Sequence, residues 1–280
     1  MRRLISRLLW AIVSGGNSRA LLRLCLKLDA ENIAARRQLY SLAHPQSSLL
    51  SKLENALALG LESGRFAALV ERNGGESRAE LFQDLVFFSL RPQGLKGAGY
   101  FVEVGLGDGV NSSNTFFMEH SLGWRGVLVE PNPSVADRIQ ARRTAPLDTR
   151  AAWHRDGEEL EFLAAEGIQL YTLVRFAEDD HHTRIGNVVP VKTARLETVL
   201  QDKNAPDHIE FLSVDTEGSE LEVLQGIDFN RRSFDFICVE HNFVEAKRDA
   251  VEAFLTEKGY CPIYREFSRF DAWYVGKRLQ

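Results

Sequence analysis

The sequence predicts an α/β fold in which a helical N-terminal region precedes a mostly parallel sheet with helices on both faces. Apolar residues recur at helical spacing from the N-terminus to about Leu90. From Tyr100 onward, short apolar runs of strand type alternate with helical segments, the pattern of a parallel sheet. The chain then finishes with two apolar runs, 260–267 and 272–276, which predict an antiparallel hairpin.

Composition limits the class of protein. The chain has 280 residues, enough for one large domain plus a helical extension, and a net charge of −5 that argues against a general nucleic-acid binder. Its cysteines, Cys25, Cys238 and Cys261, are far apart, which argues against a disulfide framework or a zinc site and favours a reducing compartment. No apolar run reaches the ~20 residues that span a membrane. We therefore expect a cytoplasmic protein.

The first 28 residues are basic, with no acid before Asp29, and their apolar residues have helical spacing. The apolar stretch is too short for a signal peptide, because Arg7 and Ser14-Gly15-Gly16 interrupt it. We expect a helix that docks on its own protein. Peripheral contact with the anionic inner face of a membrane is the alternative.

The Gly-rich stretch 91–99, which also contains Pro92, predicts a domain boundary. It separates a helical N-terminal region, residues 1–95, from a second domain, residues 96–280.

The second domain opens with a nucleoside-binding pattern. A strand, Tyr100–Val104, leads into three alternating glycines, a predicted helix over 111–120, and a second strand, 126–130, that ends on Glu130. Glycines let the backbone turn and approach a ligand closely, and a helix start favours an anionic group. A carboxylate at the tip of the second strand can accept both hydroxyls of a ribose.

The details of the glycine loop separate two cofactor classes. The dinucleotide fingerprint needs a small residue at its sixth position, which here is Val110. The chain instead reads Glu103-x-Gly105-x-Gly107-x-Gly109, which is typical of S-adenosylmethionine-dependent methyltransferases. An NAD-dependent oxidoreductase, or a non-catalytic module that keeps the cofactor fold and binds partners through its N-terminus, remains an alternative.

A second group of polar residues follows two later strands, 209–214 and 234–240. Asp215 and Glu217 come directly after the first of them, and Glu240-His241-Asn242 ends the second. If the strands are neighbours, Asp215, Glu217, Glu240 and His241 share one rim, where open α/β sheets bind ligands. The alternative is that the two acids merely cap the helix that opens at Gly218.

Other elements complete the predicted fold. We expect a strand at 149–153, helices at 134–142, 219–224 and 244–258, and an insertion between 156 and 193. The insertion carries a strand pair, 159–163 and 188–191, around a polar loop that can cover a site.

Residues 100–275 resemble the FkbM family of S-adenosylmethionine-dependent methyltransferases. The matching stretches include "FVEVGLGDGVNSSNTFFME", "LGWRGVLVEPNP", "FLSVDTEGSELEVLQGI" and "VEHN". The resemblance implies a class I methyltransferase-like Rossmann fold, a seven-stranded sheet with a C-terminal antiparallel hairpin. It implies that Asp215 and Glu217 line the methyl-transfer site and that the cofactor contacts are Glu103, Gly105, Gly107, Gly109 and Glu130, with Ser113 near the cofactor's carboxylate end.

The resemblance favours O-methylation of a saccharide or small metabolite, so the acceptor hydroxyl must lose a proton. Asp215 and His241 are our candidates for taking it, with Glu217 orienting the acceptor or its base. Asp179-Asp180-His181-His182 can be read as a metal site, as can Asp215 with Glu240 and His241. We predict no metal, because adjacent histidines point apart in extended chain.

Overall fold

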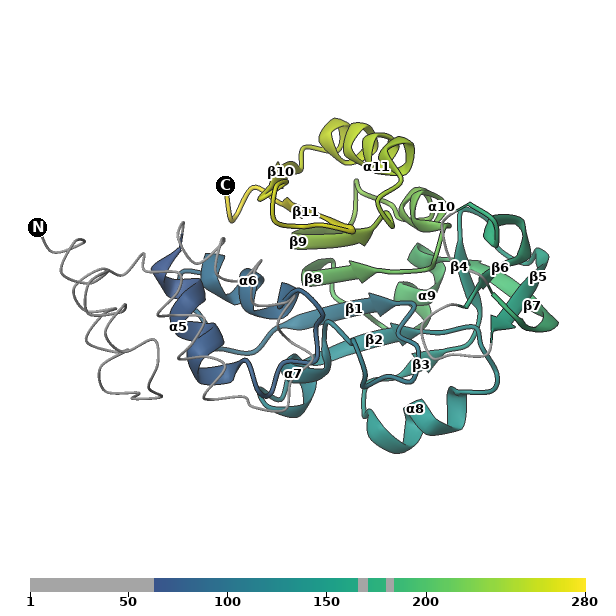
Figure 1. Cartoon of the computed structure of the whole chain (residues 1–280), viewed down its shortest axis with the longest axis horizontal. Coiled ribbons are helices and arrows are strands. Elements are labelled where there is room, and N and C mark those ends of the chain that lie inside the picture. The colour runs from purple at the N-terminus through teal and green to yellow at the C-terminus, as the bar shows by residue number, and fades with distance from the viewer. Residues whose placement is uncertain (1–62, 166–170, 180–183) are drawn as a thin grey trace, which may run out of the picture. The chain divides into compact units, whose positions relative to one another are not determined.

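The computed structural model describes residues 63–165, 171–179 and 184–280. The chain divides into two compact units, Met1–Pro92 and Gln93–Gln280. The predicted basic helix over residues 1–28 lies outside the described residues, as do Asp180, His181 and His182. Figure 1 labels the elements of both units.

Two helices make up the described part of the first unit. α5 (Gly64–Asn73) begins at Ser63, whose hydroxyl accepts a hydrogen bond from the backbone N–H of Phe66 at 3.2 Å. That oxygen satisfies one of the N–H groups that a helix leaves unpaired at its start. α6 (Gln83–Leu90) carries buried Asp84, which accepts a hydrogen bond from Ser77 Oγ at 2.8 Å. No helix within the described ranges is long and apolar enough to cross a bilayer.

The second unit is built on a seven-stranded sheet. Five strands are parallel, and the last two form an antiparallel hairpin beside them, which confirms the predicted class I methyltransferase-like fold. In space the strands follow the order β10 (Cys261–Ile263), β11 (Asp271–Val275), β9 (Ser233–Glu240), β8 (His208–Val214), β1 (Tyr100–Val104), β2 (Arg125–Val129) and β3 (Leu147–Asp148). The strand order reverses between β1 and β8, and ligands of open α/β sheets bind at the carboxyl ends beside such a switch point.

The strand register aligns four candidate site residues. Val104 of β1 pairs with Val129 of β2 and with Val214 of β8. Val214 in turn pairs with Val239 of β9. Because these four valines are level, the next residue of each strand lies at one edge of the sheet: Gly105, Glu130, Asp215 and Glu240.

Alternate strand residues hold the sheet against its helices. One core cluster joins Val102, Val127, Leu212 and Ile237 of the strands to three helices. These helices are α9 (Leu196–Asp202), α10 (Glu220–Gln225) and α11 (Glu245–Glu257). Burying a Val or Leu side chain contributes about 1.5–3 kcal/mol, so this cluster supplies much of the rigidity that holds the strand ends level.

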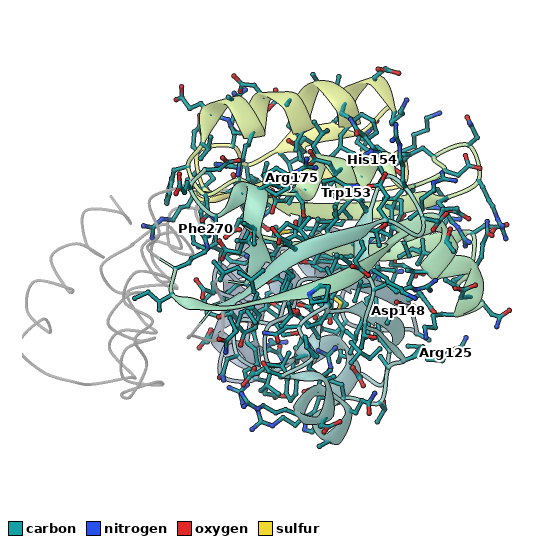
Figure 2. The ribbon with its side chains drawn as sticks, turned by 90° about the vertical axis from the view of Figure 1, so that its right-hand side faces the viewer. Arg125, Asp148, Trp153, His154, Arg175 and Phe270 are labelled. Carbon is teal, nitrogen blue, oxygen red and sulfur yellow. The ribbon has the colours of Figure 1, made fainter. Side chains whose placement is uncertain are left out.

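A second, four-stranded sheet lies at the carboxyl ends of the parallel strands (Figure 1). It contains β4 (Ala151–Trp153), β7 (Gly186–Arg195), β5 (Glu159–Ala165) and β6 (Thr172–Leu173). The predicted strand pair is confirmed, because β5 and β7 are antiparallel with Leu160 opposite Val191 and Leu163 opposite Val188. Trp153 anchors a small apolar cluster in this sheet, with the Arg175 guanidinium 5.7 Å from its ring centre and His154 beside it (Figure 2).

The predicted strand over 149–153 is wrong as a member of the main sheet. Asp148 ends β3 and accepts hydrogen bonds from the backbone N–H of Arg150 at 3.0 Å and from its guanidinium at 2.7 and 2.9 Å. This paired turn redirects the chain, and β4 then pairs with β7 in the second sheet.

The predicted helix over 111–120 is too long. α7 spans only Phe116–His120, whereas α8 (Ala136–Arg142), α10 and α11 begin and end within two residues of the predicted bounds. Asp108 accepts the backbone N–H groups of Val110 and Asn111, and Ser112 has φ +61°, so the chain before α7 is a turn held by side chains. These bonds satisfy the backbone groups that an earlier helix start would have used.

Candidate active site

Only glycine fits at the first position of the loop that follows β1. Gly105, Gly107 and Gly109 have φ values of +75°, +55° and +80°, a region that other residues occupy at a cost of about 1–2 kcal/mol. A Cβ on Gly105 would lie 1.7 Å from the carbonyl oxygen of Asp215. The loop therefore packs directly against Asp215, the residue that follows β8.

Glu130 ties this loop to the end of β2. One carboxylate oxygen accepts the N–H groups of Leu106 and Gly107 at 3.2 Å each, and the other accepts the N–H of Asn132 at 3.0 Å. Burial raises the pKa of Glu130 to about 7, against the partial compensation of these three bonds. Further hydrogen-bond donors, such as the two hydroxyls of a ribose, would stabilise the ionised form of this carboxyl group.

Asn132 adds an unused donor beside Glu130. Its Oδ1 accepts hydrogen bonds from the backbone N–H and the hydroxyl of Ser134. Its Nδ2 is buried and has no partner among the described residues. Buried polar atoms in native proteins are nearly always hydrogen-bonded, so this donor fits an acceptor atom of a ligand.

Glu103 and Ser113 bond to each other in the turn that precedes α7. The Glu103 carboxylate accepts hydrogen bonds from the hydroxyls of Ser113 and Thr115 at 2.8 and 2.6 Å and from the backbone N–H of Asn114 at 2.6 Å. Buried Arg143 lies 3.5 Å from the same carboxylate and donates to Thr115 Oγ1 at 2.8 Å. This network shapes the loop, and direct contact of Glu103 and Ser113 with a cofactor stays a prediction.

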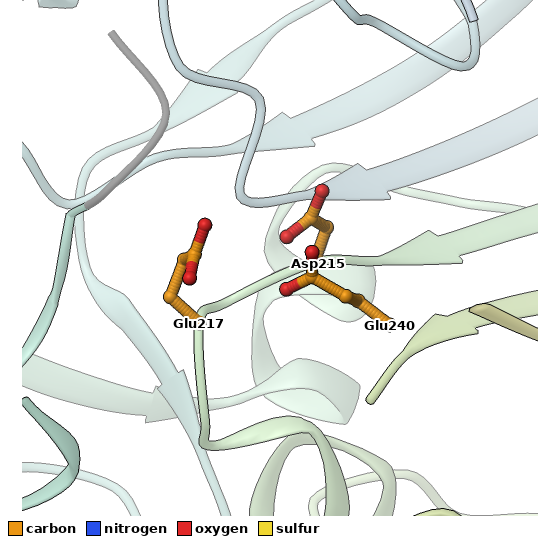
Figure 3. A group of neighbouring side chains, drawn as sticks. All are labelled: Asp215, Glu217 and Glu240. Carbon is orange, nitrogen blue, oxygen red and sulfur yellow. The ribbon is translucent and has the colours of Figure 1, made fainter. Parts of the chain in front are cut away.

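The carboxylates of Asp215, Glu217 and Glu240 come together beyond the ends of β8 and β9 (Figure 3). One oxygen of each lies within 4.8 Å of those of the other two. Glu217 has φ +57°, a strained conformation for a non-glycine residue that aims its side chain at the strand ends. The prediction that neighbouring strands gather these acids at one rim is confirmed for these three.

The three acids differ in how their neighbours stabilise or oppose the ionised form. Glu217 accepts a charge-assisted hydrogen bond from Arg184 at 2.6 Å and a second bond from Asn242 Nδ2 at 3.1 Å, and both favour its ionised form. Burial, then the charge of Glu217, raises the pKa of Asp215 well above its usual range. Burial, then Asp215 and Glu217, does the same to the pKa of Glu240. The Asp215 and Glu240 carboxyls are therefore harder to ionise than ordinary carboxyls, whereas the positive charge of Arg184 lies directly against Glu217.

Residues 103–262 match the profile of the methyltransferase FkbM domain. This match covers more than half of the chain. The chain belongs to the FkbM methyltransferase family. Among solved structures it is similar to precorrin-6y C5,15-methyltransferase from Geobacter metallireducens GS-15, at 14% identity and a TM-score of 0.37 over 70% of this chain and 86% of that chain. A comparison with curated proteins found no match.

One candidate residue of this FkbM methyltransferase lies apart from the carboxylates. Asp215, Glu217 and Glu240 form a group that does not include His241. The His241 ring donates through Nε2 to the carbonyl oxygen of Asp271 at 2.9 Å, because a carbonyl can only accept, and its Nδ1 has no partner in the described part of the chain. Burial lowers the pKa of His241, and the charged groups that act on it are Arg248 and Arg265. The expectation that His241 joins the acids at one rim is wrong.

The three carboxylates are also the kind of oxygen ligands that a divalent cation takes. Such an ion would offset the mutual repulsion of the three carboxylates. The other candidate metal site, the acidic–histidine loop, has only Asp179 among the described residues, and Asp179 lies 3.7 Å from Lys247 Nζ.

Three residues of this site were not predicted as such. Arg184 and Thr172 come from the insertion, where Thr172 Oγ1 donates to the Glu217 carbonyl oxygen at 2.8 Å. Asn242 bridges Glu217 and Glu240, at 3.1 and 3.0 Å. Asn242 stands in the "VEHN" stretch of the FkbM resemblance, which is a signal for it, whereas nothing in the local sequence of the insertion marks Arg184 or Thr172.

Proposed function

We propose that this FkbM methyltransferase transfers a methyl group from S-adenosylmethionine to a hydroxyl of a saccharide or small metabolite. The observation that carries the proposal is the alignment of Gly105, Glu130, Asp215 and Glu240 along one edge of the sheet. This alignment supports the proposal because it brings the glycine loop and Glu130 beside the carboxylates that would accept a proton.

The residues of the glycine loop fit the proposed cofactor. Glu130 would accept the ribose hydroxyls, Asn132 Nδ2 would donate to an acceptor atom of the nucleoside, and the glycine loop, which carries no side chain at Gly107 and Gly109, would lie against the amino-acid end. When bound, S-adenosylmethionine supplies an electrophilic methyl group on a positively charged sulfur. The carboxylates of Asp215, Glu217 and Glu240 favour such a positive charge nearby.

The carboxylates would orient the acceptor hydroxyl and take its proton. Glu217, fixed by Arg184 and Asn242, orients the acceptor hydroxyl through a hydrogen bond. Asp215 takes the hydroxyl proton as the new bond forms, and its raised pKa makes its carboxylate a stronger base than that of an ordinary aspartate. His241 would hold the end of β9 on β11 through Asp271. Holding acceptor and methyl donor in line supplies much of the rate acceleration.

Calorimetric titration with S-adenosylmethionine and S-adenosylhomocysteine, with NAD as the control ligand, tests the cofactor. We expect the first two to bind and NAD not to bind. Transfer of a labelled methyl group to a panel of glycosides then tests the acceptor class. Binding of NAD alone, or of none of the three, would contradict the proposal.

Replacing Glu130 by alanine is expected to weaken S-adenosylhomocysteine binding about 10²–10⁴-fold, because two hydrogen bonds to a charged acceptor are lost, at about 1.5–3 kcal/mol each. Calorimetry measures this directly. Glu159→Ala removes an exposed glutamate of β5 and should leave the affinity unchanged. Equal affinities for the two variants would place the ribose elsewhere.

The affinity for the nucleoside is expected to rise with pH and to level off above pH 7. The free-protein pKa of Glu130 is about 7, and hydroxyl donors stabilise its ionised form, so the complex binds fewer protons than the free protein. Below that pKa the affinity should fall by up to about tenfold per pH unit. Titration with 5′-methylthioadenosine, which lacks the amino-acid end, keeps the Asp215 cluster out of the measurement, and Glu130→Gln should give a flat profile.

A further inference from the structure

Two exposed apolar side chains stand beside the partners of Glu217. Within the described ranges, the exposed large hydrophobic side chains are Ile185, Val188 and Phe243. Single exposed apolar residues are common on protein surfaces. Here, however, Phe243 directly follows Asn242, and Ile185 directly follows Arg184. Two of the three thus flank, in the chain, the two side chains that hold the Glu217 carboxylate.

The Phe243 ring is held in place although 59% of its surface is exposed. Asn242 and Phe243 have φ values of +50° and +60°. Left-handed backbone costs about 1–2 kcal/mol per residue, and it persists where surrounding contacts over-determine it. Those contacts are the N–H groups of His241 and Asn242, which both donate to the Phe270 carbonyl oxygen, at 2.7 and 3.1 Å. The Phe243 ring then packs edge-on against Phe270, with ring centres 6.2 Å apart and planes at 79°.

From this placement we infer that Phe243, supported by Phe270, is a platform for the C–H face of a pyranoside ring of the acceptor. This inference rests on the proposed function and names its substrate class. A pyranoside has a rim of hydroxyls and a face of C–H groups that carry slight positive charge. The face of an aromatic ring is slightly negative and attracts such groups. The carboxylates of Glu217 and Asp215 receive the hydroxyls, and Phe243 receives the C–H face.

The alternative acceptor is a simple aliphatic alcohol, which would need apolar contact but no aromatic face. Phe243→Leu separates the two, because leucine keeps an apolar surface and removes the ring. Phe243→Tyr keeps the ring and serves as the conservative variant. Val188→Ala removes an exposed apolar side chain of β7 and is the matched control.

Saturation-transfer NMR with methyl glucopyranoside, mannopyranoside, galactopyranoside and rhamnopyranoside, in the presence of S-adenosylhomocysteine, measures the contact without needing turnover. We expect transfer to the ring C–H protons of at least one glycoside in the unmodified chain, in Phe243→Tyr and in Val188→Ala. The signal should fall about fivefold in Phe243→Leu and Phe243→Ala.

Three outcomes overturn the inference. Absence of saturation transfer to every glycoside would exclude a pyranoside acceptor. Equal transfer in Phe243→Ala would exclude Phe243 as its platform. Displacement of the glycosides by cyclohexylmethanol with undiminished binding of that alcohol to Phe243→Leu favours the aliphatic acceptor. Calorimetry on the same samples separates these failures from that of the proposed function: if S-adenosylhomocysteine does not bind, the methyltransfer proposal falls and the platform falls with it.

Discussion

Asp215→Asn is expected to lower the rate of methyl transfer by about 10²–10⁴-fold, the usual contribution of a positioned general base. The Asp215→Asn side chain keeps the size of aspartate but cannot accept a proton at neutral pH. S-adenosylhomocysteine affinity should stay within a few-fold, because the proposed nucleoside contacts come from the segments that follow β1 and β2. The measurement is the rate of labelled-methyl transfer to the acceptor found by screening, with calorimetry beside it.

Asp207→Asn is the matched control for this experiment. Asp207 immediately precedes β8 and Asp215 immediately follows it, so the two aspartates stand at opposite ends of one strand. The Asp207 side chain is 66% exposed and pairs with Arg231, a contact that contributes at most about 1 kcal/mol. It also lies 3.5 Å from buried Arg232, which keeps its ion pair with Glu197 in this variant. A variant at 215 that transfers methyl groups as fast as the variant at 207 would exclude Asp215 as the base.

Gly105→Ala is expected to lower the free energy of unfolding by about 3 kcal/mol, the sum of left-handed backbone strain and overpacking. Its Cβ would lie 1.7 Å from the Asp215 carbonyl oxygen, which belongs to backbone and cannot swing away. At about 2–4 °C per kcal/mol, the Tm should fall by about 6–12 °C, and S-adenosylhomocysteine binding should be lost as the loop moves off β8. Thermal unfolding followed by circular dichroism measures the first effect.

Gly157→Ala isolates the strain from the collision. Gly157 has φ +76°, nearly the same as the +75° of Gly105, and a Cβ there has nothing within 4 Å. This variant should lose only about 1–2 kcal/mol. If both variants melt at the same temperature, the close approach of Gly105 to Asp215 does not govern stability.

Residues that act through their immediate neighbours could be predicted from the sequence. The apolar runs 100–104, 209–214 and 234–240 form strands because each buries apolar side chains on a sheet. Asp215 and Glu240 follow two such runs, so the parallel arrangement was enough to bring them together. The start of the helix predicted over 111–120 could not be placed in this way. The Asp108 carboxylate and the Glu103 network accept hydrogen bonds from the backbone N–H groups around its first turn.

The sequence by itself determined the glycine loop, the acid at the end of each central strand and the class of fold, since strand periodicity and glycine conformation are local properties. Only the tertiary structure decided which acids act as a unit. Arg184 reaches Glu217 from an insertion 33 residues away, and Asn242 joins Glu217 to Glu240. His241 bonds to the Asp271 carbonyl oxygen instead, although it is the neighbour of Glu240 in the chain. Ionisation in a buried cluster depends on distances between side chains, and those distances exist only once the sheets have packed.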